Sequence, residues 1–359
     1  MEVTRLFDLL DNYLEKYPTQ DTALACKRNG VWLKFSIQEY VELTKYMSYG
    51  MMKLGIEPGD KVAIVSSNRP EWNMLDFATM QIGAISIPIY PTISQDDYRH
   101  ILNHAEMKMI FIEGKELRTK LEPILPEIKS LKEIFTFVDQ QSQYKYLDQL
   151  IELGKENQQP EKLTQLKAAV KPGDMATIIY TSGTTGTQKG VMLSHSNILG
   201  NVKHLENIPS KWSNKALSFL PLCHAYERML VYLYQYLGMS VYYAESLATI
   251  AENIKEINPT MMSAVPLDED TARPPCLAMR APAPAATNIE VVEMLKVCAW
   301  SPPVPTISTN WCLFNTGTLV AKSRITVAAA AISDTVSTLM RKPINKAAMI
   351  SGCNCPVMI

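Results

Sequence analysis

The sequence lacks the features that mark several classes of protein. Its 35 basic residues are balanced by 36 acidic ones, so the formal net charge is only −1. A chain without a basic excess offers no global attraction to nucleic acid or to an anionic membrane surface. No apolar run approaches the roughly 20 residues of a membrane-spanning helix. Charged residues interrupt the first twenty residues, whereas a secretory signal has an uninterrupted apolar region. We therefore expect a soluble, cytoplasmic protein that binds no nucleic acid and has no transmembrane segment, with at most a peripheral contact to membranes.

The cysteines and histidines do not form a recognisable metal or disulfide pattern. Five of the seven cysteines lie in the last quarter of the chain, and an odd number without a signal peptide does not indicate a disulfide framework. Cys353 and Cys355 have no second cysteine pair or histidine at zinc-ligand spacing in the tail. His100 and His104 stand four residues apart but lack a third ligand, so the pattern favours a solvated helix face.

What the sequence does contain is a regular alternation of strand and helix patterns. The segment Ser36 with Glu39 is a capping box, which begins a helix that Gly55 can end. Beyond it, we predict strands at Val62–Val65, Ile85–Ile89, Met109–Ile112 and Ile134–Phe137, and helices at Pro70–Ile82, after Ser94 and at Lys115–Lys129. Strands separated by helices form βαβ units, which predicts an α/β fold with parallel sheets flanked by helices.

Changes in composition suggest three regions. A polar stretch from 144 to 171 places a joint near residue 170, so we expect a first subdomain at 1–170 and a partial second subdomain at 171–266. Residues 267–359 hold nine of the 22 prolines and none of the 16 tyrosines. Those prolines interrupt most regular elements, so we expect an atypical, poorly structured tail that is out of frame or disordered.

The segment richest in chemistry follows a predicted strand at Ala176–Tyr180. The strand runs into a turn made of Thr181, Ser182, Gly183, Thr184, Thr185 and Gly186, where backbone N–H groups and hydroxyls can surround an anion. Lys189 lies close enough along a flexible loop to bring a positive charge to the outer phosphates of a nucleotide. The pattern is neither a P-loop nor a GxGxxG fingerprint. Composition alone leaves open a turn that binds nothing.

Ten residues in order decide between these alternatives. The string TSGTTGxxKG after a strand with a tyrosine resembles the phosphate loop of the adenylate-forming enzymes, which include acyl-CoA synthetases, amino-acid adenylation domains and luciferases. Segments 59–64, 67–72 and 83–92 are similar to early elements of that family. Segment 219–228, in which His224 precedes Glu227 and Arg228, looks most like the long-chain fatty acyl-CoA synthetases. The resemblance covers residues 1–266 and implies the large N-terminal domain of these enzymes.

The resemblance also implies a reaction. A fatty carboxylate attacks the α-phosphorus of ATP and expels pyrophosphate, and the thiol of coenzyme A then displaces AMP from the acyl adenylate. In this scheme Lys189 and the residues from Thr181 to Gly186 bind the phosphates, Thr181 assists Mg²⁺, and His224 lines the acyl and pantetheine pocket. Without the resemblance, we would interpret His224 as a structural residue. His195 also matches the family, although a role at a helix start explains it as well.

Several parts of the family pattern are missing after residue 266. The sequence contains no YGxTE segment, no TGD aspartate and no candidate for the C-terminal adenylation lysine. We therefore expect a truncated chain with impaired or absent ligase activity, whose exposed sheet edges and core faces favour oligomers or aggregates. Two alternatives remain: adenylation of another carboxylic acid, and a non-catalytic remnant that binds nucleotide phosphates weakly.

Overall fold

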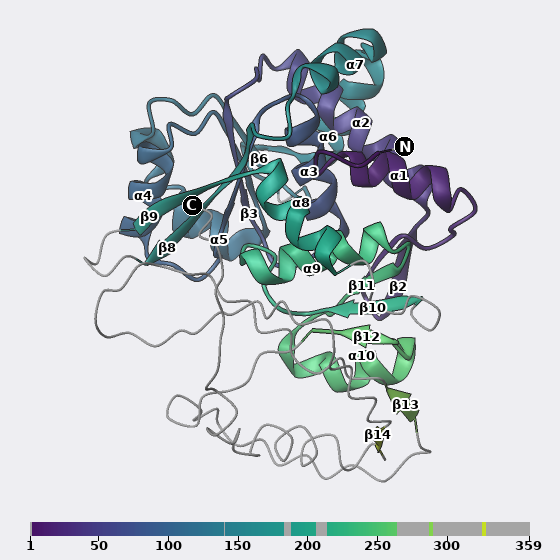
Figure 1. The fold of residues 1–359 in the computed structure, drawn as a ribbon. Coiled ribbons are helices and arrows are strands. Elements are labelled where there is room, and N and C mark those ends of the chain that lie inside the picture. Colours follow the sequence, from purple (N-terminus) through teal and green to yellow (C-terminus); the bar gives the residue numbers. More distant parts are fainter. Residues whose placement is uncertain are drawn as a thin grey trace, which may run out of the picture. The chain divides into compact units, whose positions relative to one another are not determined.

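The structure is a computed structural model that describes residues 2–139, 141–182, 188–205 and 214–263, together with two short strands. Those strands, β13 (Thr287–Ile289) and β14 (Ile325–Val327), pair antiparallel in a unit separate from the main one. In the main unit the helices are α1 (Asp8–Lys16), α2 (Ile37–Lys53), α3 (Pro70–Gln81), α4 (Gln95–His104), α5 (Gly114–Leu121), α6 (Leu147–Glu156), α7 (Pro160–Ala169), α8 (His195–His204), α9 (Ala225–Tyr236) and α10 (Ile250–Ile257) (Figure 1). None of the described helices combines the length and the apolar character needed to cross a membrane.

A seven-stranded sheet forms the larger half of the main unit. Its strands are β3 (Lys61–Val65), β4 (Ile85–Ile89), β5 (Met109–Ile112), β6 (Glu133–Thr136), β7 (Lys145–Tyr146), β8 (Met175–Ser182) and β9 (Gln188–Ser194), in the order β7-β6-β5-β3-β4-β8-β9. All neighbours are parallel except β8 and β9, which form an antiparallel hairpin at one edge. The parallel sheet predicted from the βαβ pattern is therefore confirmed.

A second sheet of five strands joins distant parts of the chain. It contains β1 (Leu24–Arg28), β2 (Val31–Phe35), β10 (Lys215–Ser218), β11 (Ser240–Tyr243) and β12 (Met261–Met262), in the order β12-β10-β11-β1-β2. Strand β1 pairs parallel with β11 and antiparallel with β2, from which it is separated by a turn at Asn29 and Gly30. Both turn residues have positive φ, at 50° and 77°, as a type I′ hairpin turn requires. Both sheets contain strands from either side of residue 170. The predicted subdomains at 1–170 and 171–266 stay a prediction.

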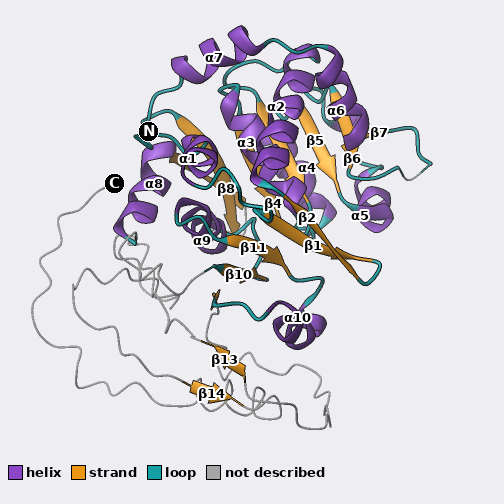
Figure 2. Cartoon of the chain, turned by 90° about the vertical axis from the view of Figure 1, so that its right-hand side faces the viewer, coloured by secondary structure: helices purple, strands orange, loops and turns teal. Residues whose placement is uncertain are grey.

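Helices α3 and α9 lie between the two sheets (Figure 2). Eleven of the twelve residues of α3 are buried, because the helix packs on α2, on β3 and β4 of the larger sheet and on β1 of the smaller one. A helix buried all round belongs to a core layer, whereas α4 and α5 pack a single apolar face on the larger sheet. The α/β architecture with helix-flanked sheets is thus confirmed, and it places the edge hairpin beside α4.

One predicted helix differs from the structure, and one stretch holds helices where no element was predicted. The helix predicted at Lys115–Lys129 ends at Leu121, because Pro123 and Pro126 break it into α5 and a short 3₁₀ turn. The polar stretch from 144 to 171 holds two helices, α6 and α7. Glycines allow α6 to approach α2 closely: a Cβ at Gly154 would lie 1.8 Å from the carbonyl oxygen of Tyr46.

Candidate active site

The predicted phosphate-binding turn connects the two strands of the edge hairpin. Strand β8 ends at Ser182 and β9 begins at Gln188. Gly183, Thr184, Thr185 and Gly186 lie outside the described residues, and of Ser182 only the backbone is described. The strand predicted before the turn is confirmed, and the turn is bounded by two antiparallel strands.

Thr181 and Lys189 stand directly opposite each other at the ends of these strands. Directly paired residues of antiparallel strands have Cβ atoms about 4.5–5.5 Å apart, so the hydroxyl and the ammonium share one face of the hairpin. Both residues are exposed. Lys189 therefore does not lie on a flexible loop as predicted but within β9, where backbone pairing fixes its position. Its contact with phosphates stays a prediction.

The described residues hold no cluster of metal ligands. No group of three or more His, Cys, Asp or Glu side chains in 2–139, 141–182, 188–205 or 214–263 could hold a metal ion. The hydroxyl of Thr181 is a hard oxygen donor of the type that Mg²⁺ accepts. It fits an ion that takes its other ligands from substrate phosphates and water, as Mg²⁺ does in nucleotide sites.

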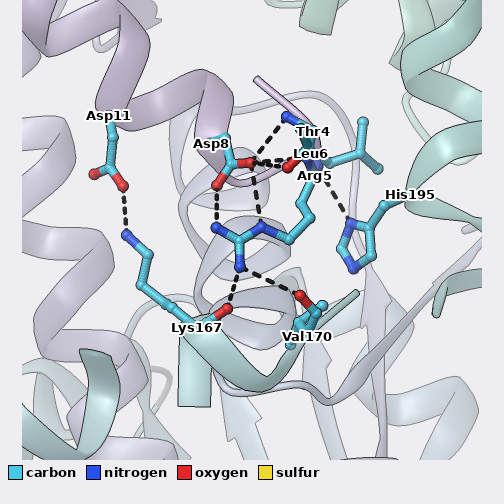
Figure 3. Close-up of polar contacts among 8 residues, drawn as sticks. All are labelled: Thr4, Arg5, Leu6, Asp8, Asp11, Lys167, Val170 and His195. Atoms are coloured by element: carbon cyan, nitrogen blue, oxygen red, sulfur yellow. Dashed lines mark hydrogen bonds and ion pairs between the residues drawn. The ribbon is translucent and has the colours of Figure 1, made fainter. Parts of the chain in front are cut away.

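The strand after the turn leads directly into α8, and this junction is fixed by a cap and a buried histidine. Ser194 caps α8, and its side chain forms a capping box with Asn197. His195, the first residue of the helix, is buried and accepts a hydrogen bond at Nδ1 from the backbone N–H of Leu6, 3.2 Å away (Figure 3). Burial lowers the pKa of His195 to about 4. The helix-start position is confirmed, and the ring is neutral and structural at pH 7.

The N-terminal segment that meets His195 is itself held by ionic contacts. Asp8 accepts hydrogen bonds from the backbone N–H groups of Thr4 and Arg5 and from the guanidinium of Arg5, which also donates to the backbone carbonyls of Lys167 and Val170 (Figure 3). Burial by itself would raise the pKa of Asp8, but these donors outweigh it and lower the pKa. The segment before α1 is thereby tied to α7 and to the start of α8.

His224 begins α9 in the second predicted part of the site. It is the N-cap residue, and its Nδ1 accepts a hydrogen bond from the backbone N–H of Tyr226 at 3.3 Å. The side chain is half-buried, and burial lowers its pKa, so the imidazole is neutral at pH 7. The structure thus gives His224 a capping role.

Asn68 orders the segment that leads to His224, a role that sequence reasoning missed. Its side-chain amide donates to the carbonyl of Leu220 at 2.7 Å and accepts from the N–H of Leu222 at 2.9 Å. This two-way contact resembles backbone pairing and fixes residues 220–222 beside the loop after β3. The signal was present in the sequence, because Asn68 belongs to the segment 67–72 that resembles the family.

Glu227 and Arg228, which the resemblance also singled out, are both fully buried. Glu227 accepts hydrogen bonds from the hydroxyls of Ser218 at 2.5 Å and of Ser263, and burial raises its pKa to about 7. Arg228 forms an ion pair with Asp76 of α3 and donates to the hydroxyl of Thr177 in β8 at 2.7 Å. These side chains connect the two sheets and hold α9 in place between them.

Comparison with known proteins agrees with this arrangement. Residues 10–286 match the family described as AMP-binding enzyme. The chain belongs to the AMP-binding enzyme family. The family match runs beyond Pro266, where the motif resemblance ends, and includes both halves of the edge hairpin and all of α9.

Relatives within the family share about a third of the compared residues. The long-chain-fatty-acid–CoA ligase FadD15 of Mycobacterium bovis is 31% identical over 241 residues, which cover 66% of this chain and 40% of that protein. Long chain acyl-CoA synthetase 6, peroxisomal, of Arabidopsis thaliana is 33% identical over 227 residues, covering 60% of this chain and 32% of that protein. The chain therefore spans a third to two fifths of the length of these relatives.

A solved structure shows the same fold. The crystal structure of a long-chain-fatty-acid–CoA ligase (FadD1) from Archaeoglobus fulgidus superposes with a TM-score of 0.60 at 25% identity, covering 72% of this chain and 50% of that one. Members of the family of acyl-CoA ligases use ATP and coenzyme A as substrates.

Proposed function

We propose that this chain contributes the triphosphate-binding part of a long-chain fatty acid–CoA ligase. One observation supports the proposal above all: Thr181 and Lys189 are exposed and face each other across the β8–β9 hairpin, next to its turn. The segment that leads into this turn has the sequence TSGTTG. An ammonium and a hydroxyl on one face, beside a turn rich in backbone N–H donors, match a polyanion. The resemblance of segment 219–228 to the long-chain fatty acyl-CoA synthetases, and the relatives named as long-chain ligases, support a long-chain fatty acid over other carboxylic acids as the substrate.

In the proposed reaction the fatty carboxylate forms a bond to the α-phosphorus of ATP while the bond to pyrophosphate breaks. Negative charge grows on the leaving oxygen, and Lys189 is placed to stabilise the β- and γ-phosphates as it does so. Mg²⁺, when bound with the nucleotide, would neutralise part of the triphosphate charge, with Thr181 as its ligand from this hairpin. The thiol of coenzyme A then attacks the acyl carbon and releases AMP, in a pocket that we propose His224 helps to line.

Titration of the 359-residue chain with MgATP tests the proposal. We expect saturable binding that weakens by roughly ten- to 100-fold in Lys189→Ala, since a charge-assisted hydrogen bond contributes roughly 1.5–3 kcal/mol. Lys162→Ala, which removes an exposed lysine on α7, is the matched control and should leave the affinity unchanged. A parent chain that does not bind ATP, or a Lys189 variant that binds it equally well, would refute the proposal.

We also propose that the 359-residue chain turns over slowly by itself. Its sequence has no YGxTE glutamate, no TGD aspartate and no C-terminal adenylation lysine, so ribose and metal contacts of the family are missing. Pyrophosphate release with ATP, Mg²⁺ and palmitate should therefore be close to background. Release at the rate of an intact synthetase would contradict this expectation.

A further inference from the structure

Two histidines of α4 contact the edge hairpin from the side opposite to the proposed phosphate site. His100 Nε2 lies 3.0 Å from the carbonyl oxygen of Gln188, and since a carbonyl only accepts, this nitrogen must donate. His104 Nδ1 lies 2.7 Å from the hydroxyl of Tyr180. The two imidazole rings are stacked with their centroids 5.4 Å apart, and the ring of Tyr180 meets His104 edge-on. His104 is exposed and His100 half-buried, so the predicted solvated face holds for His104, but both side chains also contact the hairpin.

The contacted atoms lie immediately beside the residues assigned to the phosphates. Gln188 precedes Lys189 in β9, and Tyr180 precedes Thr181 in β8. Successive side chains of a strand point to opposite faces, so Tyr180 points toward α4 while Thr181 and Lys189 point away from it. The histidines thus contact the face of the hairpin opposite to Thr181 and Lys189, and they leave the proposed ligand-binding face free.

The end of the hairpin needs such support because it extends past the neighbouring strand β4. β8 pairs with β4 only at Thr177 opposite Ser86, where the threonine hydroxyl also donates to the Ser86 carbonyl at 2.6 Å. In the part of the chain that the structure describes, β9 is the last strand of the sheet. β4 continues beside β8 to Ile89, although Pro88 has no N–H to extend the pairing, and in this register Ile89 lies level with Tyr180. Thr181 and Lys189 therefore lie beyond the end of β4, where α4 provides polar contacts to the hairpin.

We propose that His100 and His104 are positioning residues that hold the β8–β9 hairpin against α4 and so set Thr181 and Lys189 for binding the triphosphate. This inference rests on the proposed function for its effect on ATP, but the contact itself concerns the chain alone. His100 orients β9 through Gln188, and His104 orients β8 through Tyr180. The Tyr180 hydroxyl is protonated at neutral pH, as any phenol with a pKa near or above 10 is, and burial raises its pKa further.

The test compares His100→Ala with His100→Gln in the full 359-residue chain. The glutamine amide can donate to the Gln188 carbonyl as Nε2 does, whereas alanine cannot. Tyr180→Phe removes only the hydroxyl that meets His104. Asn103→Ala is the matched control, because the exposed side chain of Asn103 bonds only to the Arg99 carbonyl of its own helix among the described contacts. Hydrogen exchange of residues 188–190 without ligand, the Kd for MgATP and the thermal midpoint are measured for each chain.

We expect exchange at residues 188–190 to become about two- to tenfold faster in His100→Ala, with a similar rise in Kd, as the loss of one hydrogen bond implies. His100→Gln should restore both, Tyr180→Phe should raise both, and the thermal midpoint should stay constant. Unchanged exchange in His100→Ala, or a glutamine variant as impaired as the alanine variant, would overturn the proposal. If the parent binds no ATP, the proposed function fails, and the exchange comparison still decides whether the histidines hold the hairpin.

Discussion

Polar side chains occupy two contrasting settings in this protein. Between the sheets, Asp76 and Arg228 are 0% and 1% exposed and bond to each other, to Thr177 and to Tyr232. On the edge hairpin, Thr181 and Lys189 are exposed, and no ion pair to Lys189 occurs among the residues that the structure describes. A buried charge with a full set of partners stabilises a fold, whereas an exposed one remains available to a ligand. Substitutions in the first region should therefore change stability, and those in the second should change binding.

The largest effect is expected from breaking the buried ion pair. Arg228→Leu leaves the Asp76 carboxylate without its partner between the sheets, which should lower the free energy of unfolding by about 3–5 kcal/mol. Replacing both residues with apolar side chains should recover much of this loss. Urea unfolding measures the change, with Lys155→Ala as the control, since its pair with Glu152 is 42% and 62% exposed and contributes less than about 1 kcal/mol. A loss as small in Arg228→Leu as in the control would contradict the comparison.

A second prediction concerns two buried groups with opposite dependence on pH. The pKa of His195 falls from 6.5 to about 4 on folding, so its contribution to stability is complete above pH 6.5 and declines as the pH drops toward 4. The pKa of Glu227 rises from 4.5 to about 7, so its contribution is complete below pH 4.5 and declines as the pH rises through 7. Each effect is of the order of 3 kcal/mol, and between pH 4.5 and 6.5 the two cancel.

Single variants should reveal the two opposite dependences of the free energy of unfolding on pH. Between pH 4.5 and 6.5, His195 and Glu227 together should leave the free energy of unfolding of the parent, measured with urea, nearly constant. His195→Asn, which keeps an acceptor for Leu6, should become less stable as the pH rises, because only Glu227 then titrates. Glu227→Gln should become more stable as the pH rises. Parallel pH profiles for the three proteins would show that neither group is perturbed by burial.

The smallest effect is expected on the hairpin itself. A Cβ at Gly190 would lie 2.7 Å from Cγ2 of Ile178 and 3.3 Å from Cζ of Tyr180, so Gly190→Ala should strain the hairpin by about 1–3 kcal/mol and weaken MgATP binding. Gly200→Ala is the control, because a Cβ there meets nothing within 4 Å and alanine favours helix α8. Equal MgATP affinity in the two variants would argue that the hairpin tolerates this displacement.

Much of the fold followed from local patterns in the sequence. Strands β4 and β5 match their predicted bounds, and Ser36 and Ser94 cap α2 and α4 with capping boxes. These elements could be predicted because side-chain periodicity and capping chemistry are local. The β1–β2 hairpin was missed although Asn29-Gly30 signals its turn, and the pairing of β1 with β11 could not be predicted, because nothing local specifies so distant a partner.

The motif of the candidate site could be predicted from the sequence, but the side chains that hold the motif in place could not. The string from Thr181 to Lys189 identifies the hairpin, yet the sequence does not show that Gln188 and Tyr180 meet two histidines from α4. Nor does it show that Asn68 holds the segment before His224, because both contacts join residues far apart along the chain. Cytoplasmic location, association state and the structure of most of the tail stay predictions.

The pairing of β1 with β11 has a consequence for synthesis. Leu24 pairs with Val241, so another 217 residues must be synthesised after Leu24 before that partner exists. At 5–20 residues per second this takes roughly 10–40 s. Throughout that interval β2 covers only one side of β1, and the apolar edge formed by Leu24, Ala25 and Cys26 stays open to other nascent chains. Chaperone demand in a cell should therefore concentrate on the first 35 residues rather than on the hairpin that carries the chemistry.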